Sequence, residues 1–263
     1  MLYTVVAASL SFFVNPPAFA PRVNARMEVA APKAAGPLAE NVWSMASKVR
    51  VEGNTLKTWD LGDESIERVQ LAIGGTRRPI HANVELWTTP SYIPYKFRIY
   101  TEDGEVRPVT SIIETPKNPK TVAVYNDGQM EFPFDATVVD TGLESAYDSL
   151  KMQESELVQG AGAIRSYTFG GEVKSVQVLL KAPERNMKAR IELLQGPNQI
   201  KQSIELYSSK YVNPAFFVIQ TPGYDTTLRI INENTVEFPL EAWVLPYETD
   251  AAGAQDVVIG GGF

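Results

Sequence analysis

Two pairs of glutamates are the residues of this chain that could do chemistry together. Glu85 and Glu192 hold equivalent positions in two similar stretches of sequence, and so do Glu131 and Glu237. Glycosidases place two carboxyl groups on either side of one glycosidic bond, one as an acid and one as a base or nucleophile. A charged residue that alternates with apolar ones along a strand more often marks the solvent face. A two-carboxylate hydrolase therefore stays open as an alternative, and the sequence favours a protein that is not an enzyme.

Histidine and cysteine chemistry is nearly absent from the composition. His81 is the single histidine, its counterpart in the second stretch is Lys188, and the chain has no cysteine. A zinc site needs three or four ligands drawn largely from these two residue types, and a Ser–His–Asp arrangement would depend on His81 alone. We therefore expect no metal, no cofactor and no nucleophilic catalysis. The formal net charge of −7, without a block of Lys or Arg, argues against a nucleic-acid partner because phosphate binding needs clustered cations.

The chain contains one stretch of sequence twice. Val69 and Val176 lie 107 residues apart, and this spacing recurs along the two stretches. The same spacing relates Ala82 to Ala189, Glu85 to Glu192, Leu86 to Leu193 and Pro90 to Pro197, and a spacing of 106 relates Thr115 to Thr221, Asn126 to Asn232 and Glu131-Phe132-Pro133 to Glu237-Phe238-Pro239. A duplication of this length predicts two similar structural units in tandem.

Short apolar runs with a period of two predict β-strands from about Leu56 onward. Turn residues separate these runs at intervals that are typical of a β-sandwich. The predicted fold is all-β, with two tandem, pseudo-symmetric antiparallel β-sandwich-like domains and short flanking and linker helices. Proline cannot donate to a strand ladder, so Pro133 and Pro239 predict edge strands or bulges at the Glu-Phe-Pro elements, including a run over residues 236–238. Asn126-Asp127-Gly128 predicts a hairpin turn.

Two segments outside the β-rich copies predict helices. Leu38, Val42, Met45, Ala46 and Val49 recur at steps of three and four, which predicts a short amphipathic helix with Trp43 beside its apolar stripe. Residues 143–152 predict a second short helix. The expected organisation is a presequence and flexible segment (1–36), a first β-domain with its helix (37–140), a linker (141–162), a second β-domain (163–247) and an extended tail (248–263).

The first residues predict a targeting segment. Residues 3–14 form an apolar run that is too short to span a bilayer and has the length of a signal-peptide core. Ala18-Phe19-Ala20-Pro21 follows, and a basic, acid-poor stretch comes after it. This order resembles the two-part presequence of plastid proteins in algae with complex plastids, with Phe19 at the cleavage point. An ordinary secretory signal is the alternative. After processing we expect no membrane contact.

The presequence, the tandem β-rich copies and the missing catalytic set together resemble the pyrenoid shell proteins of diatoms. The resemblance runs from about Leu56 to Tyr247, and its marks are Val84-Glu85-Leu86 with Ile191-Glu192-Leu193 and the two Glu-Phe-Pro elements. It implies a structural protein of the plastid (chloroplast) stroma that self-assembles into a thin sheet at the pyrenoid periphery. It further implies that the sheet encloses a Rubisco condensate and supports CO2 concentration and fixation. The implied partners are further copies of the chain, Rubisco or other shell-family proteins.

Candidate contacts for such an assembly lie at the two ends of the chain. A lattice needs more than one kind of contact, because a single two-fold interface stops at a dimer. Val257, Val258 and Ile259 form a β-prone triplet, and Phe263 follows three glycines. This tail predicts either a frayed terminus or a strand that adds to a sheet edge on a neighbouring subunit. Trp43 completes the set of predicted self-assembly contacts.

Aromatic residues favour one further alternative, a carbohydrate-binding β-sandwich that stacks sugars on exposed rings. The first copy carries the aromatic residues Trp59, Trp87, Tyr92, Tyr95 and Tyr100. The second copy has Leu194 where Trp87 stands, and it keeps Tyr100 as Tyr207. Core and interface packing therefore explains these aromatics better than a duplicated sugar site.

Overall fold

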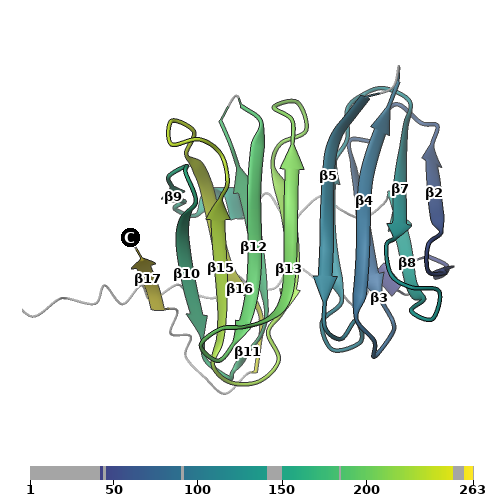
Figure 1. The fold of residues 1–263 in the computed structure, drawn as a ribbon. Coiled ribbons are helices and arrows are strands. Elements are labelled where there is room, and N and C mark those ends of the chain that lie inside the picture. The colour runs from purple at the N-terminus through teal and green to yellow at the C-terminus, as the bar shows by residue number, and fades with distance from the viewer. Residues whose placement is uncertain are drawn as a thin grey trace, which may run out of the picture.

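Alternating apolar and polar residues give this chain a fold of antiparallel strands in two layers (Figure 1). The computed structural model describes residues 42–43, 46–89, 92–140, 150–183 and 185–250, and the backbone of 258–262. The first copy contributes β1 (Val49–Val51), β2 (Leu56–Leu61), β3 (Arg68–Gly74), β4 (Ile80–Thr88), β5 (Tyr92–Thr101), β6 (Val109–Glu114), β7 (Lys120–Asn126) and β8 (Phe134–Val139). The second copy contributes β9 (Glu156–Val158), β10 (Ala163–Phe169), β11 (Val173–Lys181), β12 (Met187–Gln195), β13 (Gln199–Ser208), β14 (Ala215–Gln220), β15 (Thr226–Asn232) and β16 (Leu240–Thr249), and β17 (Val258–Gly262) follows.

The strands form two sheets that face each other across one apolar core. Sheet A has the order β1-β8-β3-β6-β14-β11-β16-β9, and sheet B has the order β17-β10-β15-β12-β13-β5-β4-β7-β2. Strand β4 illustrates the alternation, since Ala82, Val84 and Leu86 are fully buried whereas His81 and Trp87 are exposed. The predicted all-β class is therefore confirmed.

The strand pairings of the first copy recur in the second. Strand β3 pairs with β6 and β8, just as β11 pairs with β14 and β16. Strand β4 pairs with β5 and β7, just as β12 pairs with β13 and β15. The outer pairs follow the same rule, with β1 on β8 and β2 on β7 matched by β9 on β16 and β10 on β15.

The two copies meet edge to edge in both sheets. Strand β5 pairs with β13 in sheet B, where Ile99 lies opposite Ile204, and β6 pairs with β14 in sheet A. Both sheets are therefore continuous across the whole repeat. Phe97 and Phe217 meet in the core at this seam, edge to face with ring centroids 5.3 Å apart. The Ser111 hydroxyl adds a buried hydrogen bond across the seam by donating to the Phe216 carbonyl at 2.9 Å.

One buried asparagine in each copy ties three segments together. Asn126 Nδ2 donates to the carbonyls of Val51 at 3.0 Å and Phe132 at 2.9 Å, and its Oδ1 accepts from the backbone N–H of Gly128 at 2.8 Å. Asn232 repeats the arrangement with the carbonyls of Val158 and Phe238 and the N–H of Asn234, at 3.0, 2.8 and 3.0 Å respectively. Both asparagines are 0% exposed, so water cannot replace these bonds.

This asparagine corrects two expectations about the loops. The predicted hairpin turn at residues 126–128 is wrong, because β7 belongs to sheet B and β8 to sheet A, so the chain crosses between layers there. The Glu-Phe-Pro elements are not in strands, since β8 begins at Phe134 and β16 at Leu240. Instead, an arginine guanidinium group lies over the aromatic ring of each element. The distance from the guanidinium carbon to the ring centre is 5.5 Å for Arg78 and Phe132 and 4.2 Å for Arg185 and Phe238.

The predicted helices are shorter than their sequence patterns. Val42 and Trp43 are helical, but Val49 lies in β1, where it pairs with Ala136, so the apolar stripe does not continue as a helix to that residue. In the linker the structure describes a single 3₁₀ turn, η1 (Leu150–Met152), and residues 143–149 of the predicted helix lie outside the described residues. Within the described part of the chain, no helix is long and apolar enough to cross a membrane.

Replacing either buried asparagine should destabilise the fold. In an Asn126→Ala or Asn232→Ala variant, one buried and one part-buried carbonyl lose their donor, and we expect the free energy of unfolding to fall by about 2–4 kcal/mol. Chemical denaturation followed by circular dichroism measures this loss. Asn83→Ala on the outer surface of β4 is the control and should stay within about 0.5 kcal/mol of the parent chain. Equal stability of all three variants would contradict the role assigned to Asn126 and Asn232.

Candidate assembly surfaces

The ends of the two sheets are the first surfaces that could join one copy to another. Sheet A ends at the three-residue strands β1 and β9, whereas sheet B ends at β17 on one side and at the six-residue β2 on the other (Figure 1). Strand β17 pairs with β10 of its own chain over five residues. An edge strand presents unpaired N–H and C=O groups, so it can accept another strand. Of the four ends, β2 is the longest edge that no described strand covers.

The structure places two of the predicted contact residues of the tail within β17. Val258 lies opposite Thr168 and Ile259 lies opposite Tyr167, both on β10 of the same chain. Val257 and Phe263 lie outside the described residues. The predicted contact between subunits through these four residues stays a prediction, and the structure adds that the segment is able to pair with a sheet B edge.

The outer face of sheet A is apolar in both copies. In the first copy Val42, Ala72 and Val139 form a buried cluster. Trp43, the remaining predicted contact residue, packs half-buried against this cluster, with the Lys48 ammonium 5.1 Å from its ring centre. A larger buried cluster lies on the same face across the seam, and it consists of Ile112 of the first copy, Leu150 of the linker, and Leu179, Phe216, Val218 and Trp243 of the second copy.

The η1 turn holds this second cluster against the sheet. Leu150 is 1% exposed and packs among the cluster residues, whereas Met152 in the same turn points outward and is 87% exposed. The Trp243 indole N–H donates to the Gln153 carbonyl at 2.9 Å, which fixes the end of the turn on β16. The η1 turn of the linker thus covers part of the apolar outer face of sheet A.

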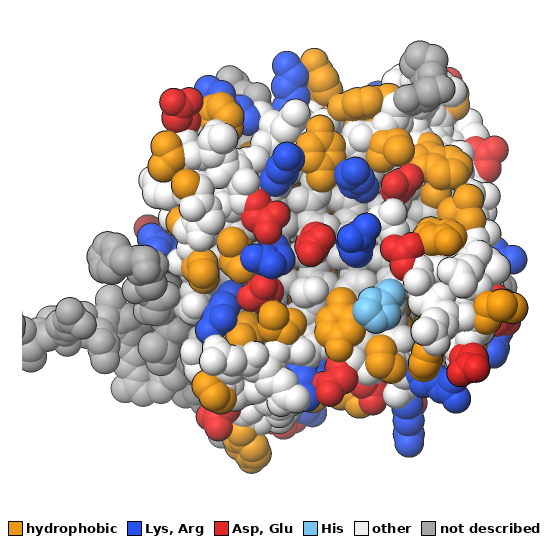
Figure 2. Space-filling view, in the orientation of Figure 1, with side chains coloured by type: hydrophobic (Ala, Val, Ile, Leu, Met, Phe, Trp, Pro, Cys, Tyr) orange, Lys and Arg blue, Asp and Glu red, His pale blue; other side chains and the backbone are white. Residues whose placement is uncertain are grey.

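The outer face of sheet B is charged instead. Lys96 lies between Glu85 and Tyr207 on the neighbouring strands, and Arg98 lies between Asn83 and Glu205. Figure 2 shows the resulting band of interspersed cationic and anionic side chains across the middle of this face. Unlike charges at neighbouring positions stabilise one another, and their desolvation opposes burial against an apolar surface.

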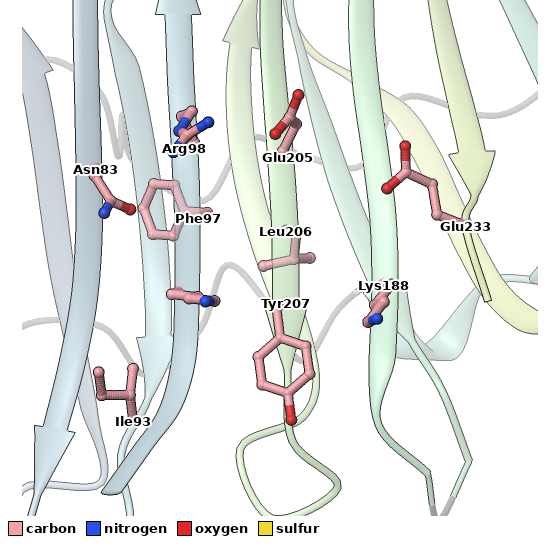
Figure 3. A pocket seen from close by; sticks show the side chains of 10 residues that line it. Asn83, Ile93, Phe97, Arg98, Lys188, Glu205, Leu206, Tyr207 and Glu233 are labelled. Carbon is pink, nitrogen blue, oxygen red and sulfur yellow. The ribbon is translucent and has the colours of Figure 1, made fainter. Parts of the chain in front are cut away.

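A depression of about 620 Å³ lies in this charged band, across the seam between the copies. Figure 3 shows side chains from β4, β5, β13 and β12 around it. Its polar lining residues include Asn83, Lys96, Arg98, Lys188, Glu205 and Glu233. Next to it Arg190 holds Glu233 at 3.2 Å and Glu192 at 3.5 Å. The mixture of both charge signs in this depression suits a polar surface of another macromolecule better than one small anion or cation.

The carboxylate pairs of the sequence do not form a two-carboxylate site. Glu85 on β4 and Glu192 on β12 share the outer face of sheet B, but three strand spacings, or about 14 Å, lie between the two strands. The register also places Glu85 level with Lys188 of β12, four residues from Glu192 (192 − 188), so the two glutamates lie further apart than the strands. Glycosidase carboxyl groups lie about 5–9.5 Å apart. Glu131 and Glu237 lie at opposite ends of the molecule, because the corresponding strands β5 and β13 run antiparallel and the matched loops point in opposite directions.

Histidine and metal chemistry is likewise not assembled among the described residues. His81 is exposed on β4, and its ring lies 5.1 Å from that of Tyr100 in a tilted arrangement. Within residues 46–250, leaving aside the undescribed gaps, no three residues among His, Asp and Glu come together as a metal site would require.

Three buried polar side chains have shifted pKa values that reflect packing. Burial raises the pKa of the Tyr95 hydroxyl, and burial together with the nearby Glu156 carboxylate raises the pKa of Tyr167. Burial lowers the pKa of Lys120, whose ammonium donates to the carbonyls of Ile66 and Pro116, the latter at 3.0 Å. The hydrogen bonds of Lys120 connect the start of β7 to the loop carbonyls before it and before β3.

The aromatics of the first copy separate into core and surface. Tyr95 is fully buried, Trp59 is half-buried, and Trp87 and Tyr92 are exposed. The Trp87 indole N–H donates to Glu85 Oε2 at 2.8 Å, which holds the ring on the outer surface of sheet B. A shallow hollow of about 260 Å³ lies beside it, lined by Leu56, Asn83, Glu85, Ala123 and Tyr125 as well as by Trp87.

Comparison with known proteins assigns the family. The family model described as diatom pyrenoid shell protein matches residues 43–246. The chain belongs to the diatom pyrenoid shell protein family. The predicted family is thereby confirmed, and the match covers both copies of the repeat and the seam between them. A search of curated proteins gave no match.

Solved structures add little to this assignment. Vicilin from Solanum lycopersicum (tomato) is 7% identical, with 75% of each chain covered and a TM-score of 0.18. The VP2 subviral particle of infectious bursal disease virus is 8% identical, with 80% of this chain and 64% of that chain covered and a TM-score of 0.12. These TM-scores carry no argument about the fold or function of the shell protein.

Sequence reasoning missed the two surfaces that now stand out. The charged band of sheet B was hidden because its members come from four strands, and only the strand register brings them together. The open edge at β2 was also missed, although Trp59 of β2 and Tyr167 of β10 occupy matching places in the two copies. The signal that indicates this edge is the correspondence of β2 with β10, because among the described strands only β10 has a further strand on its outer side.

Removing the contact between Leu150 and the outer cluster of sheet A should lower the stability of the fold. Leu150→Ala takes a fully packed side chain out of the outer cluster, and we expect a loss of about 2–4 kcal/mol in the free energy of unfolding. Met152→Ala in the same turn is the matched control and should change stability by less than about 0.5 kcal/mol. Thermal and urea unfolding of the two variants measure the difference. If both variants behave alike, η1 does not hold the cluster on sheet A.

Proposed function

We propose that this shell protein is a non-enzymatic structural protein that self-assembles into a sheet enclosing the Rubisco-containing pyrenoid. It acts in the plastid stroma at the pyrenoid periphery and supports CO2 concentration and fixation. Membership of the diatom pyrenoid shell family supports a structural shell role. The observation that carries the assembly is the arrangement of sheet B, which ends at the five-residue β17 on one side and, on the other, at the six-residue β2, whose outer edge no described strand covers.

The physical argument starts from the edges. Soluble β-proteins block long edge strands, because an open edge recruits strands from other chains. Here the inner edges of the two copies pair with each other, and the outer edges lie at the two opposite ends of the molecule (Figure 1). Contacts between different surfaces of identical copies do not close on themselves unless a rotation brings them round, so they extend an array.

The two outer faces give such an array two chemically different sides. Residues of the same chain cover part of the apolar face of sheet A, whereas no described segment covers the charged face of sheet B. Charged faces resist stacking of one layer on another, because burial would desolvate them. The layer therefore grows sideways through its edges. Rubisco or other shell-family proteins are the partners we propose for the charged face.

The remaining parts of the chain complete the proposal. Residues 1–36 act as the plastid-targeting presequence and flexible segment, and the mature protein has neither a nucleic-acid partner nor a membrane contact. The units 37–140 and 163–247, with the linker 141–162, form the body. In the tail 248–263, residues 248 and 249 complete β16, and the residues beyond them reach a neighbouring copy. Trp43, Val257, Val258, Ile259 and Phe263 are the proposed contact residues.

Electron microscopy of the purified mature chain tests the proposed function. We expect ordered sheets or tubes one molecule thick, since the edge contacts act within a layer. Analytical ultracentrifugation of the same sample over a range of concentrations should show mass growing well beyond a dimer. A chain that stays monomeric or dimeric at high concentration, with no ordered structure in micrographs, would contradict the proposal.

Shortening the tail tests the part that we assign to residues 251–263. A chain that ends at Asp250 keeps all of β16 and the ion pair between Lys174 Nζ and Asp250 Oδ1 at 2.5 Å, so its body should fold. We expect it to form no extended sheets, or only small fragments, under conditions where the full chain assembles. Circular dichroism confirms folding of the variant. Sheets of unchanged extent would show that the tail is dispensable.

One observation favours a second candidate function, carbohydrate binding. Trp87 is fixed on an exposed sheet surface beside Tyr125 and two polar side chains, as in sites that stack sugar rings. An oligosaccharide array probed with the full chain should then give binding that Trp87→Ala weakens about tenfold or more, because the ring supplies the stacking surface. Tyr211→Ala, at an exposed loop tyrosine elsewhere, is the control. An array without signal removes this candidate.

A further inference from the structure

Strands β2 and β10 occupy the same place in the two copies. Strand β2 is the outer neighbour of β7, and β10 is the outer neighbour of β15. The register matches them residue by residue, since Trp59 lies opposite Val122 and Tyr167 lies opposite Leu228, where Val122 and Leu228 correspond in the repeat. Lys57 and Thr58 then correspond to Arg165 and Ser166, so the two strands also resemble each other in side-chain type.

The outer edge of β10 already accepts a strand. Strand β17 pairs with it antiparallel, with Ile259 opposite Tyr167, Gly260 opposite Ser166 and Gly261 opposite Arg165. The equivalent edge of β2 ends sheet B, and no described strand pairs with it. Among the described strands, β17 is therefore a strand that can be donated, and β10 and β2 are two equivalent edges that can accept it.

Exposure of the matched residues reflects this difference. Positions that are half-buried on β10 are exposed on β2, and an aromatic side chain that is buried on β10 is half-buried on β2. The matched pairs are Ile164 with Leu56, Arg165 with Lys57, Ser166 with Thr58, and Tyr167 with Trp59. Leu56, for example, is 45% exposed. Strand β2 is therefore the same kind of acceptor as β10, without its covering strand.

We propose that residues 258–262 of a second copy add to β2 as an antiparallel strand, in the register that they adopt on β10. Ile259 of that copy then lies opposite Trp59, Gly260 opposite Thr58 and Gly261 opposite Lys57. This contact rests on the proposed self-assembly and names its acceptor edge. It joins different parts of two identical chains, as a growing array requires.

The composition of β17 suits an edge that differs in side chains from its own. Three of its five residues are glycine, so backbone hydrogen bonds rather than side-chain fit supply most of the attraction. A cationic side chain is no obstacle, because Arg165 stands at the position on β10 that Lys57 holds on β2. Charged residues at an edge usually discourage pairing, but β10 pairs with β17 despite its arginine.

Own and neighbouring edges compete for the same strand. In dilute solution β17 pairs with β10 of its own chain, because the covalent connection keeps β17 at a high effective concentration beside that edge. At high protein concentration the edge of β2 on a neighbour becomes available and offers a similar ladder of hydrogen bonds. Moving the strand exchanges one ladder for another, so assembly through β2 depends strongly on protein concentration.

The absence of native cysteine makes disulfide trapping a clean test. One preparation carries Thr58→Cys alone and another carries Gly260→Cys alone, and the two are mixed under assembling conditions and mildly oxidised. Residues opposite each other on antiparallel strands lie within disulfide range. We expect a disulfide between the two different chains, formed about tenfold or more faster than when Ser203→Cys, at the centre of sheet B, replaces Thr58→Cys.

Two further pairs protect the test. Lys57→Cys with Gly261→Cys should cross-link as well as the first pair if the register holds. Ser166→Cys and Gly260→Cys in one chain should give an internal disulfide in dilute solution, which shows that a cysteine at 260 leaves β17 able to pair. If that internal disulfide forms but neither mixed pair exceeds the Ser203→Cys background, the proposed contact is overturned.

Microscopy of the same mixtures separates this inference from the proposed function. Ordered sheets without cross-links at β2 would overturn the acceptor edge and leave the structural function intact. Absence of both sheets and cross-links would overturn both proposals. Cross-linked chains within ordered sheets support both.

Discussion

Backbone pairing between β5 and β13 and between β6 and β14 is the constraint on which the rest of the shell protein depends. Each copy of the repeat ends in open strand edges. Unpaired backbone N–H and C=O groups destabilise a protein when they are buried, and they pair with strands of other chains when they are exposed. Joining the inner edges gives two continuous sheets around one core, with Phe97 and Phe217 packed at the junction. The same joint makes corresponding strands run in opposite directions, so it decides which edges and loops are left at the two ends.

What remains after this joint is a body whose surfaces have separate tasks. A buried asparagine in each copy joins the segment that crosses between the layers to the backbone of a neighbouring strand. The apolar outer face of sheet A is occupied by the chain itself, through Trp43 in the first copy and Leu150 in the second. The outer face of sheet B carries interspersed charged side chains, and none of the described segments covers it (Figure 2). In the proposed assembly, growth takes place at the sheet ends, where β17 is the donated strand and β2 is the accepting edge.

The sequence predicted the all-β class, the family and most strands, because those depend on local alternation and on a repeat that can be read directly. The joint between copies could not be predicted, since side-chain alternation marks a strand but does not say which other strand it pairs with. Asn126 was visible as a repeated residue but was interpreted as a turn, because one of its partners, the Val51 carbonyl, lies 75 residues away. Similarly, Glu85 and Glu192 matched in sequence, and only the strand order shows the distance between them.

A density map of the assembled protein by cryo-electron microscopy, at a resolution that separates strands, tests the central claim that sheet edges make the lattice. The account predicts that sheet B continues past β2 into a strand of a neighbouring copy, antiparallel to it and traceable to residues 258–262. Contacts made through the outer faces, with β2 bare on its open side, would contradict it.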